Sequence, residues 1–80
     1  MNLDMQASEI FCQNLKDVVE QRRLKISELA KMVGIARPTM SDIINGKENV
    51  TLNRAQRIAQ AIDVPLTTLL EENAMHHAQA

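Results

Sequence analysis

The apolar residues of this chain recur every three or four positions, which is the spacing of amphipathic α-helices. In the first such segment, Ser8 is a candidate N-cap and the apolar positions continue to about Arg22. No segment alternates apolar and polar residues as a half-buried strand does, and the chain has no internal repeat. The pattern therefore predicts an all-α protein of five short helices.

Glycines mark the ends of the next two predicted helices. Gly34 ends a helix that begins at Ile26, because glycine adopts the left-handed conformation of a helix C-terminus at little cost. A tight turn follows, and a third helix is predicted from Arg37 to Asn45, ending at Gly46. These residues predict two short helices separated by a turn.

Thr51 is the predicted N-cap of a fourth helix, and Pro65 is suited to the first position of a fifth. Residues 1–7 have no apolar periodicity and are expected to form a loose arm. Residues 73–80 contain good helix formers but no apolar stripe, and they are expected to form a tail. The predicted helical domain is therefore residues 8–72.

Length and composition fit one small domain, because 80 residues leave no room for a second core. Cys12 is the sole cysteine, which excludes an internal disulfide and a cysteine-based metal cage, and we expect it to be a buried hydrophobe. The N-terminus lacks the pattern of a signal peptide, and no stretch reaches the ~20 apolar residues of a membrane span. We therefore expect a cytoplasmic protein.

The charges are unevenly distributed, although the formal net charge is only −1. Residues 22–57 hold eight basic and three acidic residues, a balance of +5, and the rest of the chain has a balance of −6. Local potential governs phosphate binding more than net charge does. Two interpretations are open, a basic face for nucleic acid and an ordinary mixed-charge surface.

The third predicted helix has the most informative surface. At about 100° per residue, Met40, Ile43 and Ile44 fall on one side of it. The other side and its flanks carry Arg37, Pro38, Thr39, Ser41, Asp42 and Asn45. Short polar side chains let the helix backbone approach a partner closely, and such a helix fits the major groove of B-DNA.

Several of these residues have a chemical partner in that groove. Arg37 can donate to guanine through two hydrogen bonds, and Asp42 can accept from cytosine. Thr39 can contact a thymine methyl group, and Ser41 can reach a base or a phosphate; the alternative is that both are merely solvated. Pro38 disfavours helical geometry at Arg37, so Arg37 is a candidate N-cap and the direction of its side chain is open.

The order of these elements is similar to a helix-turn-helix. The segment LKISELAKMVGIARPTMSDIINGK, residues 24–47, resembles the lambda-repressor-like family, also called Cro/CI or Xre type. The resemblance covers about residues 15–71 and continues through Thr51-Leu52, Ile58-Ala59, Ala61-Ile62-Asp63-Val64-Pro65 and Leu69-Leu70. It implies five helices, a helix-turn-helix at 26–45, dimeric binding to a two-fold symmetric operator, and a bacterial or phage origin.

The resemblance also implies which residues touch DNA. The positions that contact bases in the family are here Arg37, Pro38, Thr39, Ser41 and Asp42. Asn45 and Lys47 stand where family members bind phosphate, although Asn45 can equally cap the helix. Arg54 lies in the first turn after the loop and is a further phosphate candidate.

Besides Pro38, the chain departs from the family pattern in two places. A phosphate-binding glutamine often begins the second helix, but Ile26 stands there, so Lys25 or Ser27 is expected to replace it. Many members pair an arginine with a glutamate where this chain has Val19 and Ile44, which predicts an apolar contact instead. The other basic residues, among them Arg22, Arg23, Lys31 and Arg57, are expected mostly to be solvated.

The sequence therefore predicts a regulator of transcription, a repressor that binds specific double-stranded DNA as a homodimer. Leu66, Leu69 and Leu70 are the candidate dimer residues, and the alternative is that they belong to the monomer core. The competing function is an antitoxin that binds a toxin through its acidic ends and its Met75-His76-His77 tail, and that also binds its own promoter.

Other functions are not favoured by the residues present. We expect no catalytic site, cofactor or metal, because no histidine falls on the core pattern and no glycine-rich phosphate loop is present. His76 and His77 are adjacent and would diverge by about 100° on a helix, which makes a poor chelate. RNA and single-stranded DNA are usually bound on aromatic platforms, and Phe11 is the sole aromatic residue.

Overall fold

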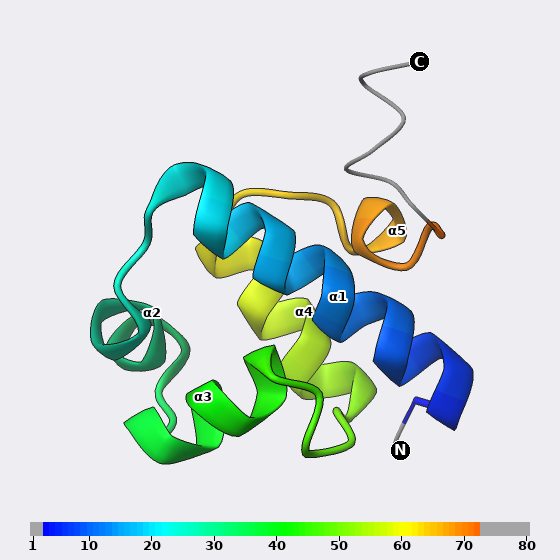
Figure 1. Ribbon diagram of the computed structural model, residues 1–80, viewed down its shortest axis with the longest axis horizontal. Coiled ribbons are helices and arrows are strands. Elements are labelled where there is room, and N and C mark those ends of the chain that lie inside the picture. Colours follow the sequence, from blue (N-terminus) through cyan, green and yellow to red (C-terminus); the bar gives the residue numbers. More distant parts are fainter. Residues whose placement is uncertain (1–2, 73–80) are drawn as a thin grey trace.

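The fold is a cluster of five α-helices, seen in a computed structural model that describes residues 3–72. The helices are α1 (Met5–Arg22), α2 (Ile26–Val33), α3 (Arg37–Ile44), α4 (Leu52–Ala61) and α5 (Leu66–Leu69). Helix α2 packs against α3 and α4, whereas α1 packs against α3 and α5 (Figure 1). The prediction of an all-α, five-helix fold is confirmed.

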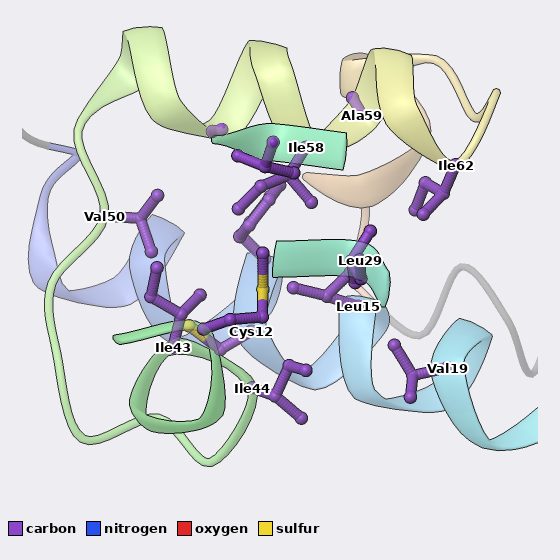
Figure 2. Close-up of a cluster of buried hydrophobic side chains, with 14 of the residues drawn as sticks. Cys12, Leu15, Val19, Leu29, Ile43, Ile44, Val50, Ile58, Ala59 and Ile62 are labelled. Carbon is purple, nitrogen blue, oxygen red and sulfur yellow. The ribbon is translucent and has the colours of Figure 1, made fainter. Parts of the chain in front are cut away.

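The predicted apolar stripes meet in one core (Figure 2). Leu15, Leu29 and Ile58, from three different helices, are all fully buried there, and burial of each stabilises the fold by about 1.5–3 kcal/mol. Val19 and Ile44 are buried in the same cluster, where the sequence predicted an apolar contact in place of an ion pair. Cross-helix apolar packing therefore supplies the stability that such short helices lack alone.

The N-terminal region differs from the prediction. Helix α1 begins at Met5, and Asp4 rather than Ser8 is its N-cap, because the Asp4 carboxylate accepts a hydrogen bond of 2.8 Å from the Ala7 N–H. Ser8 lies inside the helix and is buried. The prediction of a loose arm over residues 1–7 is therefore wrong from Asp4 onward, and residues 1 and 2 lie outside the described residues.

The helix ends predicted at the glycines are confirmed. Gly34 has a φ of 83° and donates its N–H to the Ala30 carbonyl at 2.8 Å, which closes α2. Gly46 has a φ of 72° just after the C-cap of α3, Asn45. Thr51 caps α4 as predicted: its hydroxyl accepts a 3.1 Å hydrogen bond from a first-turn N–H.

Helix α3 begins at Arg37, as predicted, so Arg37 is not the N-cap that Pro38 made it a candidate for; Ala36, with φ −67° and ψ 146°, has that position. The restriction that Pro38 places on Arg37 is only a preference, and Pro38 occupies a first-turn position whose N–H has no partner within the helix. Pro65 is the N-cap of α5 rather than its first residue.

Residues 73–80, with the His76-His77 pair, lie outside the described residues. Among the described helices, none combines the length and the apolar character that crossing a bilayer requires. Within residues 3–72 there is also no group of three or more metal-binding side chains.

Candidate nucleic-acid interface

Helix α3 is held by its buried side and shows its polar side to solvent. Met40 and Ile43 are fully buried and Ile44 nearly so, and these three side chains anchor the helix in the core. The opposite side and its flanks hold the predicted base-contact residues: Arg37, Pro38 and Asp42 are exposed, and Thr39 and Ser41 are half-buried. The backbone of α3 is thus fixed while a row of short polar side chains remains accessible.

The predicted phosphate-binding residues come from three parts of the chain: the start of α2, the end of α3 with the loop after it, and the start of α4. Lys25 and Ser27 are exposed at the start of α2, and Asn45 and Lys47 are exposed at the end of α3 and in the loop after it. Arg54 is half-buried in the first turn of α4. Helix α3, the α3–α4 loop and the start of α4 follow one another along one edge of the molecule (Figure 1).

The N-termini of α2 and α3 differ from those of α1 and α4. Asp4 caps α1 and Thr51 caps α4 through their side chains. Lys25 and Ala36, the N-caps of α2 and α3, form no such hydrogen bond within the described residues. The first-turn N–H groups of these two helices therefore lack a side-chain acceptor, and uncapped N–H groups at a helix N-terminus favour an anion.

Asn45 caps the C-terminus of α3, which was one of its two predicted roles. Its side-chain amide donates to the Ser41 carbonyl at 2.9 Å and to the Ser41 hydroxyl at 3.4 Å. The backbone N–H of Lys47 donates to the Asp42 carbonyl at 2.8 Å and closes the same end. Capping and phosphate binding are compatible, because the Asn45 residue as a whole stays exposed.

Three polar side chains that the sequence did not single out for this purpose bind the C-termini of other helices. Arg57 donates to the Val33 carbonyl at 2.7 Å, at the end of α2 and beside the turn of the helix-turn-helix. Arg22 donates to the Ile62 carbonyl at the end of α4. Both arginines are exposed, as expected of solvated charges, but each also binds a helix C-terminus.

Asn14 is the third of these side chains, and it ties α1 to the end of α5. It is 2 % exposed, and its amide donates to the Leu69 and Glu71 carbonyls at 2.8 and 2.7 Å. The sequence held a signal for this contact, since Asn14 falls on the apolar stripe of its helix, three residues after Phe11. Nothing comparable marks Arg22 or Arg57, because both residues are exposed and arginine is an ordinary residue on the exposed surface of a helix.

Of the three leucines predicted at a dimer interface, one is excluded. Leu69 is fully buried in the core of the single chain, which was the alternative interpretation. Leu66 and Leu70 are half-buried at the edge of the core and retain surface. Leu66 also borders a hollow of about 400 Å³ whose other walls come from α4 and the α4–α5 connection.

Comparisons with known proteins agree with this geometry. The family model of the Cro/C1-type HTH DNA-binding domain matches residues 14–74. Among solved structures, the fold is similar to that of a hypothetical transcription factor, NHTF, from Neisseria, with a TM-score of 0.78 and 20% sequence identity over 100% of this chain and 93% of that chain. No curated protein matches the sequence at a significant level.

Proposed function

Because the chain belongs to the Cro/C1-type helix-turn-helix DNA-binding family, we propose that it is a transcriptional repressor that binds a two-fold symmetric operator as a homodimer. The observation that carries the proposal is the surface of α3, where accessible polar residues stand on a helix fixed by Met40, Ile43 and Ile44. A rigid helix of this kind presents its side chains to base edges in the major groove.

The base contacts in this proposal are made by Arg37, Pro38, Thr39, Ser41 and Asp42. Arg37 is the first residue of α3, and the N-terminal end of a recognition helix is the part that usually lies nearest the bases. Its guanidinium suits guanine, and the Asp42 carboxylate suits the cytosine amino group. Thr39 and Ser41 are half-buried and retain accessible surface, and their short side chains let the helix backbone lie close to the bases.

Phosphate contacts fix the position of the protein on the duplex in this proposal. The uncapped N–H groups of α2 and α3 supply donors, and Lys25 and Ser27 stand beside the first of these helix ends. Asn45, Lys47 and Arg54 supply the contacts beyond the end of α3. Such contacts carry little sequence information but set the register from which bases are read.

The dimer in this proposal uses the end of the molecule that carries α5. Leu66 and Leu70 are the candidate contact residues because they are half-buried and border exposed surface. A contact between two copies of the same patch gives the two-fold symmetry that a palindromic operator requires.

Selection from a pool of random duplexes with the purified chain tests the proposal most directly. We expect enrichment of a sequence with two inverted half-sites, and a sedimentation experiment should show two protomers on it. The repressor would be contradicted, and an antitoxin favoured, by a pair of results: the pure chain enriches no sequence, and it binds duplex DNA only when a second small protein copurifies with it. Enrichment of a single asymmetric site would contradict the dimer alone.

A further inference from the structure

The α3–α4 loop is held at its far end by the start of α1. Val50 is fully buried and points from this loop into the core (Figure 2). Its N–H donates to the Ser8 hydroxyl at 3.2 Å, and its carbonyl accepts a 2.9 Å hydrogen bond from the Leu3 N–H. Both backbone groups of Val50 are therefore satisfied by one short N-terminal segment.

The near end of the same loop is held by α3. Lys47 donates its backbone N–H to Asp42, and Gly46 donates to the Ile43 carbonyl at 3.1 Å. Only two residues, both exposed, separate Lys47 from Val50. The backbone position of Lys47 therefore depends on both attachments, one to the recognition helix and one to α1.

Ser8 is the central group of the second attachment. It is 3 % exposed, and it also hydrogen-bonds the thiol of Cys12 one helical turn later. A buried N–H such as that of Val50 loses its partner if this hydroxyl is removed, because solvent does not reach it. Leu3 and Ser8 precede residue 14, where the family match begins, whereas Val50 lies within the matched residues.

We propose that the segment 3–12 is a positioning element for DNA binding, and that Ser8 holds the α3–α4 loop where Lys47 can reach a phosphate. The inference rests on the proposed function, since it needs Lys47 to bind DNA. Ser8 itself touches no DNA in this proposal, and its effect passes through Val50. The start of α1 thus positions a residue of the interface without touching DNA, although it lies outside the helix-turn-helix.

The test compares Ser8→Ala, Ser8→Thr and a matched control, Val18→Ala, in the full chain. The probe is a labelled random-sequence duplex of about 30 base pairs, long enough for two half-sites one helical turn apart. Dissociation constants are measured by fluorescence anisotropy at several salt concentrations. Val18 is buried on the same helix about 15 Å from Ser8 along the axis, so its variant loses core packing without touching the loop.

Ser8→Ala is expected to weaken binding about 2- to 10-fold and to reduce the salt dependence. Ser8→Thr keeps the hydroxyl and should restore both quantities, whereas Val18→Ala should lower the melting temperature and leave the salt dependence unchanged. In a Lys47→Ala background, Ser8→Ala should cause no further loss of affinity. This non-additivity separates positioning from general destabilisation, because the stability losses should remain additive.

An unchanged salt dependence in Ser8→Ala would overturn the inference, and so would a full additional loss of affinity in the Lys47→Ala background. If Ser8→Thr does not fold, the double-mutant comparison with Lys47→Ala decides alone. Failure of the proposed function gives a different result: the unmodified chain then binds no duplex at any salt concentration.

Discussion

Arg37 and Lys47 are both exposed cations near the ends of α3, but they have different roles in the proposed complex. Arg37 begins the helix, where its fork of donors can meet a base. Lys47 lies just beyond the Asn45 cap, and its compact charge suits a phosphate, which is the same in every sequence. The two roles therefore lead to different predictions.

Replacement of Arg37 by alanine should cost about 1–3 kcal/mol of binding free energy on the selected operator and relax the preference at one base pair. The measurement is affinity for the operator and for its three single-base variants at that pair. Arg23→Gly is the matched control. It also removes one positive charge, at the end of α1, and glycine readily adopts the φ of 54° found there. Equal loss on all four duplexes would make Arg37 a phosphate contact.

Replacement of Lys47 by alanine should weaken binding uniformly across sequences and reduce the slope of log affinity against log salt by about 1. The physical reason is that one fewer phosphate is neutralised, so about one fewer counterion is released. Titrations at several salt concentrations measure this slope. If the slope of the variant equals that of the unmodified protein, Lys47 does not belong to the interface.

At the scale of elements, the turn between α2 and α3 is held from outside the helix-turn-helix. The Arg57 guanidinium, on α4, binds the last carbonyl of α2, and a Cβ added to Gly34 would lie 3.1 Å from the same guanidinium. Gly46 has a similar backbone conformation, but nothing lies within 4 Å of a Cβ added there. Alanine substitutions at the two glycines therefore distinguish the cost of backbone strain, which both share, from the loss of the Arg57 contact, which only Gly34 adds.

We expect Gly46→Ala to lower the free energy of unfolding by about 1 kcal/mol, through left-handed strain alone. Gly34→Ala should cost about 1 kcal/mol more, because the guanidinium must move away from the Val33 carbonyl. Urea denaturation of both variants measures the difference. In an Arg57→Ala background the excess should disappear, and an excess that persists would show that Arg57 is not its cause.

The sequence could predict this fold where a residue acts through its own segment. The apolar periods located α2 and α3, and Gly34 marked the turn, because each of these depends on backbone preferences within a few residues. The N-cap of α1 was predicted at Ser8 but is Asp4. Both residue types cap helices, and the burial of Ser8 against Val50 depends on tertiary contact that the sequence does not reveal. Leu69 was ambiguous for the same reason, because burial of an α5 leucine depends on where α1 lies.

For the candidate site, the sequence predicted the residues on the surface of α3 but not the contacts that come from other helices. Periodicity identified the polar side of α3, and the family resemblance supplied the groove and the phosphate positions. The Asn45 cap was anticipated because it acts within one helical turn. The contact of Arg57 with Val33 could not be anticipated, since it joins residues 24 apart in sequence and neither residue type signals it.

At the scale of the whole molecule, Cys12 links the core to solution pH. Burial raises the pKa of its thiol, and the hydrogen bond with Ser8 opposes this shift only in part. A raised pKa means that the folded chain holds the proton more tightly, so the stability that the protonated thiol contributes is complete below the ordinary thiol pKa and is lost as pH rises above it.

The unmodified chain should therefore lose stability between about pH 8 and pH 10 relative to Cys12→Ala. Urea denaturation of both proteins at several pH values measures the difference in unfolding free energy. Alanine leaves a small cavity, which shifts the variant by a constant amount and leaves the pH dependence as the informative quantity. Parallel profiles over this range would show that the Cys12 pKa is not raised.

Hydrogen bonds fasten both ends of the described chain to the rest of the domain: Leu3 binds Val50 in the α3–α4 loop, and Asn14 of α1 holds the carbonyls of Leu69 and Glu71. The first and last residues of a small domain ordinarily fray, and their amide protons exchange with solvent long before the core opens. Here the backbone amides near both ends should exchange only when the whole domain unfolds. The domain would then unfold as one cooperative unit, and on heating its affinity for DNA would be lost in the same single transition.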